Sequence, residues 1–126
     1  MTYFQTNRYI STKKVNVGGQ KYDSKFEAGY GQELDLRKKA GDIKDYARQV
    51  KLDLSVNGYH ICNYYIHFVV TNKDGSKDYV ELKGLSMPVF RLKWKLFEAL
   101  FDTDFKEHPD DKMTLIMQQS KWKTRR

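Results

Sequence analysis

The central stretch of the chain, residues 50–83, reads VKLDLSVNGYHICNYYIHFVVTNKDGSKDYVELK. Apolar and polar side chains alternate over residues 50–56, which predicts a strand with one buried face. Asn57-Gly58 is a strong signal for a two-residue hairpin turn. Residues 59–70 are rich in aromatic and β-branched side chains and predict a second strand. Near its end this strand becomes apolar on both faces, as a central strand does.

A second turn follows at Lys73-Asp74-Gly75, where the glycine suits the left-handed position of a three-residue loop. This loop leads into a third predicted strand, residues 77–83, and completes an antiparallel meander. Continuing the ladder from the loop sets His67 opposite Glu81, with Cβ atoms about 4.5–5.5 Å apart. A two-residue loop would instead shift the register and separate the two side chains.

A helix is predicted before the meander. Ser24 is a suitable N-cap, and Glu27, three residues later, completes a capping-box pattern. Gly41 is placed to end the helix just after Ala40. Gly29 and Gly31 each cost about 1 kcal/mol inside a helix relative to alanine. We therefore expect another backbone to approach the helix closely there.

A second helix is predicted over residues 86–101, with Pro88 tolerated in its first turn. Its expected apolar stripe consists of Val89, Leu92, Leu96, Phe97 and Leu100. Short strands are expected at residues 15–17 and 113–117. The order of helix, three-stranded meander, helix and strand predicts an α/β fold, a central mixed sheet flanked by helices.

Length and composition indicate one globular domain spanning residues 1–126, since 40% of the residues are hydrophobic and 31% are charged. No apolar run approaches the roughly 20 residues that span a bilayer. Residues 1–10 lack the apolar core of a signal peptide. A single cysteine, Cys62, excludes an internal disulfide and a cysteine-based zinc site. These features predict a soluble, cytoplasmic protein.

The charge balance is strongly basic, with 23 Lys and Arg against 16 Asp and Glu and a net charge of +7. Phosphate neutralisation is a common reason for such an excess, although a solvated basic surface is the alternative. Basic residues gather in an N-terminal arm (about residues 1–14) and a C-terminal tail (about residues 119–126). The candidate nucleic-acid-binding residues are Lys13, Lys14, Lys93, Lys95, Lys121, Lys123, Arg125 and Arg126.

Glu81 and Lys83 end the third strand and share one face of it, while Leu82 points into the opposite layer. A carboxylate beside an ammonium group suits phosphodiester hydrolysis. The carboxylate holds a divalent cation, and the lysine orients or deprotonates water or neutralises transition-state charge. Taken alone, most such triplets are ordinary surface pairs with no catalytic meaning.

Further motifs accompany this triplet along the chain. They are YDSKFEA (22–28), GDI (41–43), Gln49, IHF (66–68), DG (74–75), ELKG (81–84), FRLK (90–93) and KLF (95–97). Their order and spacing resemble the PD-(D/E)XK nuclease superfamily over about residues 15–101. More narrowly, they resemble small phage proteins related to archaeal-type Holliday junction resolvases and to phage junction endonucleases.

The resemblance implies a restriction-endonuclease-like core and a homodimer that cuts branched DNA with Mg²⁺ or Mn²⁺. The family's catalytic positions fall on Glu27, Gln49, Glu81 and Lys83, with Gln49 as a support to the site. The implied metal ligands are Glu81, His67, Glu27 and Leu82. For Glu27, the alternative role is helix capping alone.

His67 departs from the family pattern. The family strand reads roughly Tyr-x-x-Asp-Phe, whereas this chain has Tyr64-Tyr65-Ile66-His67-Phe68. Imidazole suits Zn²⁺, Mn²⁺ or Fe better than Mg²⁺. Three explanations stay open: a natural histidine ligand, a natural loss of activity, or a substitution made to inactivate the protein.

The leading hypothesis is a metal-dependent Holliday junction resolvase, working in the host cytoplasm if a phage encodes it. A nuclease of the same fold with another DNA substrate is a second hypothesis, and a catalytically silent nucleic-acid-binding module is a third. Trp94 or Phe101, or the helix face with Gly29 and Gly31, could supply the dimer contact. We expect His60 and His108 to be surface residues.

Overall fold

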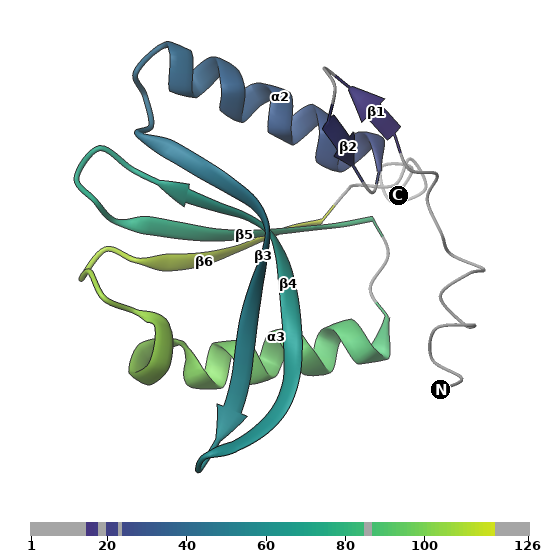
Figure 1. Cartoon of the computed structure of the whole chain (residues 1–126), viewed down its shortest axis with the longest axis vertical. Coiled ribbons are helices and arrows are strands. Elements are labelled where there is room, and N and C mark those ends of the chain that lie inside the picture. Colours follow the sequence, from purple (N-terminus) through teal and green to yellow (C-terminus); the bar gives the residue numbers. More distant parts are fainter. Residues whose placement is uncertain (1–14, 18–19, 23, 85–86, 118–126) are drawn as a thin grey trace, which may run out of the picture.

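The computed structural model describes residues 15–17, 20–22, 24–84 and 87–117 (Figure 1). In chain order its elements are β1 (Val15–Val17), β2 (Gln20–Tyr22), α2 (Lys25–Lys39), β3 (Asp45–Val56), β4 (Tyr59–Thr71), β5 (Lys77–Lys83), α3 (Pro88–Leu100), the π-helical turn η2 (Phe101–Phe105) and β6 (Lys112–Met117). The basic arm, the basic tail and the expected helix start at Ser86 lie outside the described residues.

The main sheet has the strand order β3-β4-β5-β6. Strands β3, β4 and β5 form an antiparallel meander, and β6 pairs with β5 in parallel. The small strands β1 and β2 form a separate antiparallel pair. The predicted mixed α/β architecture and the predicted order of elements are therefore confirmed. Strand β3 begins at Asp45, five residues before its predicted start.

Both turns of the meander have the expected geometry. Asn57 and Gly58 take φ values of 52° and 83°, the left-handed pair that a two-residue hairpin needs. In the second turn, the Asn72 amide donates to the Ser76 carbonyl at 2.8 Å, and Gly75 has a φ of 90°. The ladder runs on to the Phe68–Val80 pair, so the next positions are His67 and Glu81. The predicted register is correct.

Helix α2 begins as the sequence indicates, because the Ser24 hydroxyl accepts a hydrogen bond from the Glu27 amide at 3.1 Å. It ends at Lys39, and Gly41 follows with a φ of 80°. The expectation of close backbone approach is wrong at Gly29. A Cβ atom built there meets nothing within 4 Å among the described residues.

The predicted apolar stripe of α3 is partly wrong. Leu92 is 71% exposed and Val89 is 37% exposed, whereas Phe97 is fully buried. Leu96, Phe97 and Leu100 of the predicted stripe do pack in the core beneath α3. Phe90 and Trp94 also pack there, in place of Val89 and Leu92. Phe101 is also buried and does not offer the free apolar surface expected for a dimer contact, whereas Trp94 is half-buried against the same core.

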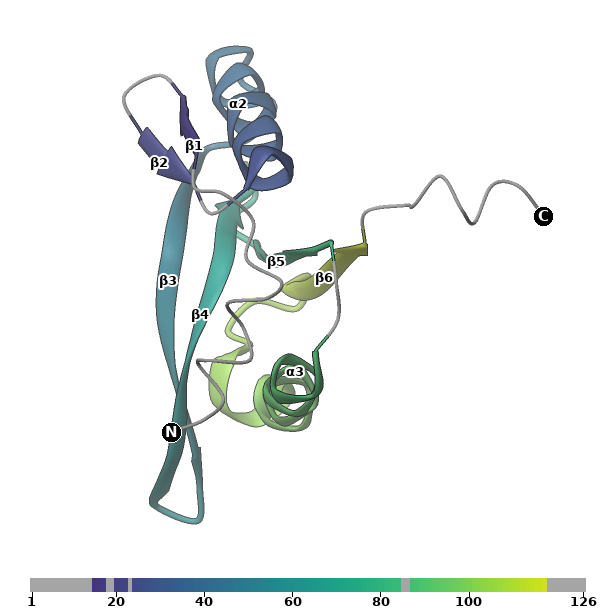
Figure 2. The same ribbon diagram turned by 90° about the vertical axis from the view of Figure 1, so that its right-hand side faces the viewer.

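The two helices cover opposite faces of the sheet, and each has its own hydrophobic core (Figure 2). The core beneath α2 contains Leu34, Phe68 and Val80. The core beneath α3 is centred on Phe97, whose ring makes edge-on contacts with several aromatic neighbours. Each such pair adds about 0.5–1.5 kcal/mol beyond simple burial. The strand positions that carry His67 and Glu81 therefore lie in a sheet with a packed core on each face.

Along β4, the alternation of side chains between the two faces of the sheet is broken at His67. Ile66 packs in the core beneath α3, but Phe68, two residues further, packs in the core beneath α2. In a regular strand these two side chains would share one face. At the same point the pairing of β4 with β5 ends, and the β3–β4 hairpin continues alone past α3 (Figures 1 and 2). Strands β4 and β5 thus separate at His67 and Glu81, and this point of separation is called the fork.

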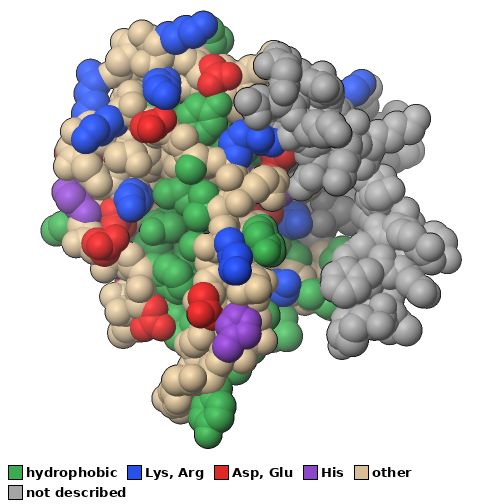
Figure 3. All heavy atoms as spheres, in the orientation of Figure 1, with side chains coloured by type: hydrophobic (Ala, Val, Ile, Leu, Met, Phe, Trp, Pro, Cys, Tyr) green, Lys and Arg blue, Asp and Glu red, His purple; other side chains and the backbone are tan. Residues whose placement is uncertain are grey.

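One face of the molecule has hydrophobic side chains in its middle, surrounded by charged residues (Figure 3). An open hollow of about 290 Å³ lies between β3, β4 and β5, and its lining includes Val50, Leu52 and Tyr79.

Among the described residues, none of the helices is long and apolar enough to cross a membrane.

Candidate active site

Helix α2 delivers a buried carboxylate to the fork. Glu27 lies in the first turn, where the positive end of the helix dipole favours an anion. Its side chain is 1% exposed, and its Oε2 atom accepts a hydrogen bond from Gln49 Nε2 at 2.8 Å. Glu27 therefore does more than complete the helix cap, since its carboxylate points into the cluster of predicted site residues.

Gln49 reaches Glu27 because its backbone is left-handed, with a φ of 51°. It lies on β3 between the pairs Arg48–Phe68 and Val50–Ile66, and hence opposite His67. A left-handed backbone at a residue other than glycine costs about 1 kcal/mol or more, and such strain gathers at functional sites. The supporting position that the resemblance gave to Gln49 is thus matched by a direct contact to Glu27.

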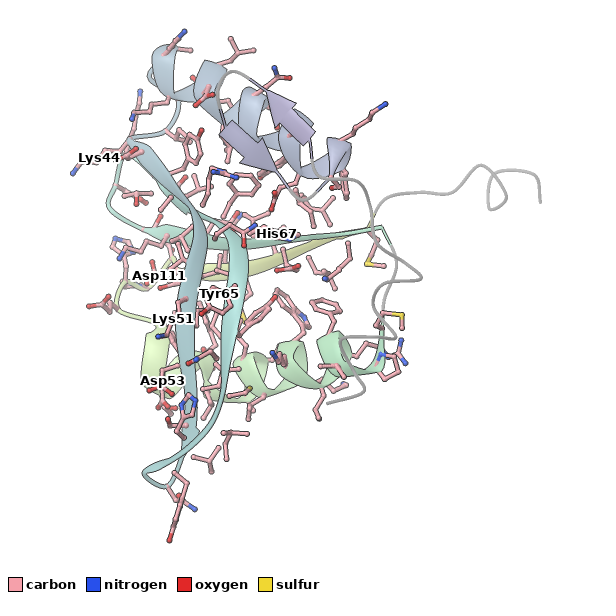
Figure 4. All side chains as sticks on the ribbon, turned by 45° about the vertical axis from the view of Figure 1, so that its right-hand side comes forward. Lys44, Lys51, Asp53, Tyr65, His67 and Asp111 are labelled. Carbon is pink, nitrogen blue, oxygen red and sulfur yellow. The ribbon has the colours of Figure 1, made fainter. Side chains whose placement is uncertain are left out.

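His67, which is labelled in Figure 4, lies between the carboxylates of Glu27 and Glu81. Its Nε2 atom is 3.4 Å from Glu27 Oε2, and its Nδ1 atom is 3.5 Å from Glu81 Oε2. The Leu82 backbone amide donates to Nδ1 at 3.3 Å, so a neutral His67 carries its proton on Nε2, facing Glu27. The change of facing at His67 is what allows one ring to meet both acids.

Glu81 and Lys83 share one face of β5 as predicted. The Lys83 ammonium is 3.6 Å from Glu81 Oε2 and 4.5 Å from the centre of the Phe90 ring on α3. The cation–ring contact fixes the lysine head beside the carboxylate while leaving it partly open to solvent. Leu82 is buried in the opposite layer, as expected, so only its backbone carbonyl could act as a metal ligand.

Tyr64 holds the other oxygen of Glu81. Its hydroxyl donates to Glu81 Oε1 at 2.7 Å, and both residues are buried. Burial, together with the adjacent carboxylate, holds the pKa of Tyr64 well above its usual range, so it stays a donor. Sequence reasoning did not give Tyr64 a role, although it is the tyrosine of the Tyr-x-x-Asp-Phe pattern.

Burial raises the pKa of Glu81 to about 7, against the lowering effects of the Tyr64 hydrogen bond and the Lys83 charge. The native protein therefore holds a proton on Glu81 up to about pH 7, whereas the unfolded chain releases it near the ordinary glutamate pKa of 4.5. Loss of hydration therefore raises the pKa of Glu81 by more than the Tyr64 hydrogen bond and the Lys83 charge lower it. A cation next to Glu81 would supply the missing stabilisation.

The residue types at the fork suit a divalent cation, but His67 meets Glu27 through Nε2 and Glu81 through Nδ1, so in this conformation the three side chains do not surround a single ion position. Nδ1 of His67 and Oε2 of Glu81 face each other at 3.5 Å, and the Lys83 ammonium lies 3.6 Å from the same oxygen. Two carboxylates with one imidazole suit Mn²⁺ or Zn²⁺ better than Mg²⁺, which prefers oxygen ligands. The predicted ligands Glu27, His67 and Glu81 are therefore brought together.

The predicted phosphate-binding lysines that can be placed lie on α3. Lys93 is half-buried and donates to the backbone carbonyl of Asn63 at 3.1 Å, whereas Lys95 is exposed. The other six lie outside the described residues: Lys13, Lys14, Lys121, Lys123, Arg125 and Arg126. His60 is exposed, as expected, with its Nδ1 2.6 Å from Asp53 Oδ1.

A second group of metal-ligating side chains lies away from the fork, in the loops before β5 and β6. Ligand atoms of Asp74, His108 and Asp110 lie within 4.8 Å of one another. Their known contacts shape the loops: Asp74 accepts from Ser76, and His108 Nδ1 accepts from the Asp110 amide. This loop group provides a control for metal binding at the fork.

Residues 7–124 match a protein family described as "Protein of unknown function (DUF1064)". Because the match covers nearly the whole chain, the chain belongs to this family. Comparison with curated proteins and with solved structures found no match.

Glu81→Gln is expected to stabilise the metal-free protein above pH 7 by roughly 3 kcal/mol, since it removes a desolvated charge while keeping an acceptor for Tyr64. The raised pKa stabilises the native state below about pH 4.5, and that contribution is lost as the pH rises through about 7. Urea unfolding at pH 5 and pH 8 measures the difference. Glu98→Gln on the exposed part of α3 is the control. An equal pH dependence in wild type and Glu81→Gln would contradict this prediction.

Proposed function

We propose that this protein is a metal-dependent endonuclease of the PD-(D/E)XK type that cuts branched DNA, as a Holliday junction resolvase does. The observation that carries the proposal is the cluster at the fork. Glu27, His67, Glu81 and Lys83 come from three separate elements and meet where β4 leaves β5. The order of helix, three-stranded meander, helix and parallel strand supports the same core.

Glu81, Glu27 and His67 are the residues that would hold the ion, with the Leu82 carbonyl as a further oxygen donor. A bound Mg²⁺ or Mn²⁺ neutralises phosphate charge and lowers the pKa of water. Tyr64 keeps Glu81 oriented, and Gln49 does the same for Glu27. The Lys83 ammonium stands beside Glu81, where it can stabilise the charge that develops on a phosphate.

A homodimer is part of the proposal, because a four-way junction offers two equivalent strands for incision. The direct test is cleavage of a synthetic four-way junction in Mg²⁺ and in Mn²⁺, with a linear duplex of the same sequence beside it. Preferential cutting of the junction supports a resolvase. Equal cutting of both substrates supports a nuclease of broader specificity. No cutting in either metal removes the enzymatic proposal.

A catalytically silent nucleic-acid-binding module is the second candidate. The observation that favours it is the position of His67, whose ring contacts both carboxylates and the Leu82 amide, where an ion would otherwise be bound. Junction binding without cleavage in either metal would support this reading.

Binding to DNA is expected to be salt-sensitive. If Lys95 and the basic arm and tail neutralise phosphates, log affinity falls with log salt by about 0.9 per phosphate on duplex arms. Lys95→Gln should reduce this slope by about one unit, whereas Lys112→Gln on β6 is the control. Fluorescence anisotropy at several salt concentrations measures the slope. An affinity unchanged between low and moderate salt would contradict nucleic-acid binding.

A further inference from the structure

The β3–β4 hairpin carries an exposed aromatic and cationic surface next to the candidate site. Tyr65 is 53% exposed although its neighbours Tyr64 and Ile66 are buried. Its cross-strand partner is Lys51, which is also exposed. Directly opposed residues on one face have Cβ atoms about 4.5–5.5 Å apart, so the ring and the ammonium group can contact one ligand.

This pair directly follows the cluster at the fork. Tyr65 lies two residues before His67 on β4, and Lys51 lies two residues after Gln49 on β3. Figure 4 shows His67, Tyr65 and Lys51 close together along the hairpin, with Asp53 further towards its tip. An extended ligand strand that reaches the fork along the hairpin therefore passes Tyr65 and Lys51.

Neither helix covers this surface. Leu52, Leu54 and Tyr64 face α3, so their neighbours Lys51 and Tyr65 point to the other side of the hairpin. Helix α2 packs on the other half of the sheet, over Phe68 and Val70. Ile61, which is 54% exposed, adds apolar area further along β4.

We propose that Tyr65 and Lys51 bind an unpaired nucleotide next to the scissile phosphate, with the base stacked on Tyr65 and its phosphate on Lys51. This inference rests on the proposed function. A nucleotide is the repeating unit that offers a flat apolar ring and an anion within the reach of one cross-strand pair. The net charge of +7 favours a polyanion, such as a nucleic-acid strand, over a single small acidic ligand.

The proposal gives a physical basis for selecting branched DNA. In an intact duplex both faces of every internal base are stacked on other bases, so Tyr65 has no ring to contact. At a branch point, a flap or a gap a base can leave the stack at low cost. Tyr65 therefore adds affinity for branched or single-stranded DNA and none for duplex.

The test compares Tyr65→Ala, Tyr65→Trp and Tyr59→Ala for binding to a four-way junction and to a linear duplex. Tyr59 is the matched control, because it is 75% exposed on the same hairpin but lies at its tip. Stacking on an aromatic side chain changes affinity about tenfold or more per base. We expect Tyr65→Ala to lose about this factor on the junction with unchanged duplex binding, and Tyr65→Trp to retain it.

A second readout reports the stacking itself. A 2-aminopurine base at the branch point should lose fluorescence quenching in Tyr65→Ala and keep it in Tyr59→Ala. Thermal unfolding of each variant verifies that the fold is intact. Sedimentation shows whether Tyr65→Ala changes the oligomeric state, in which case the surface is a contact between two copies and the proposal is wrong.

The outcomes separate this inference from the proposed function. If wild type binds and cuts the junction but Tyr65→Ala and Tyr59→Ala behave alike, the stacking proposal falls and the nuclease stands. If wild type binds neither DNA, both fall. A selective loss of junction binding in Tyr65→Ala supports the proposal even where cleavage is slow.

Discussion

Glu81→Gln and Lys83→Ala are each expected to reduce cleavage of a four-way junction by roughly 10²- to 10⁴-fold. Glu81→Gln removes a negative charge that would hold the proposed metal ion. Lys83→Ala removes the ammonium group that lies 3.6 Å from Glu81 Oε2. Junction affinity should stay nearly unchanged, because exposed lysines and the basic ends carry most of the phosphate contacts. Gel-based cleavage under single-turnover conditions, with anisotropy for binding, measures both quantities.

Two controls make this comparison specific. Glu98→Gln and Lys112→Ala change the same residue types at exposed positions and should cut like wild type. Glu81→Gln is also expected to fold at least as stably as wild type, so loss of structure does not explain loss of cleavage. If Glu81→Gln and Lys83→Ala both cut normally, the pairing of these residues on β5 has no catalytic meaning.

The register at the site was predictable because local turn chemistry decides it. Asn57-Gly58 and Gly75 each impose a left-handed backbone that few other residues adopt. Once these two turns are fixed, period-two alternation fixes which residues face each other. The placement of His67 near Glu81 followed from one loop length, and the structure has both side chains in contact.

The change of facing between Ile66 and Phe68 could not be read from the sequence. Both residues are apolar and buried, so alternation does not distinguish which core each one joins. The left-handed Gln49 carries no compositional signal either, since glutamine has no preference for that conformation. The contact of His67 with Glu27 therefore depends on a local irregularity that only the folded chain displays.

The face of α3 was misjudged for a different reason. A helical stripe that reaches Phe97 through Val89 and Leu92 is as regular as one that reaches it through Phe90 and Trp94. Hydrophobic periodicity gives two overlapping solutions here, and aromatic packing against Tyr64 and Tyr79 selects the second. The same selection places Phe90 under the Lys83 ammonium.

His67→Asp is expected to raise cleavage in Mg²⁺ by roughly 10- to 100-fold, the range in which one changed group near a metal alters its binding. An aspartate beside Glu81 and Glu27 adds an anionic oxygen donor, which a hard cation prefers to imidazole. Wild type should accordingly be more active in Mn²⁺ than in Mg²⁺, and the variant should narrow that gap. Cleavage of one junction by both proteins in both metals is the measurement.

Stability gives an independent readout of the same substitution. Without metal, His67→Asp places a third carboxylate next to two buried ones and should lower the melting temperature, because like charges repel in a desolvated site. Added metal should restore it, since an ion that binds only the native state stabilises by about 2.7 kcal/mol at 100 times its Kd. His108→Ala, which removes the loop group with Asp74 and Asp110, should leave this metal response unchanged. If wild type cuts well in Mg²⁺ and His67→Asp gains neither activity nor metal-dependent stability, His67 is a structural bridge between Glu27 and Glu81 and not a metal ligand.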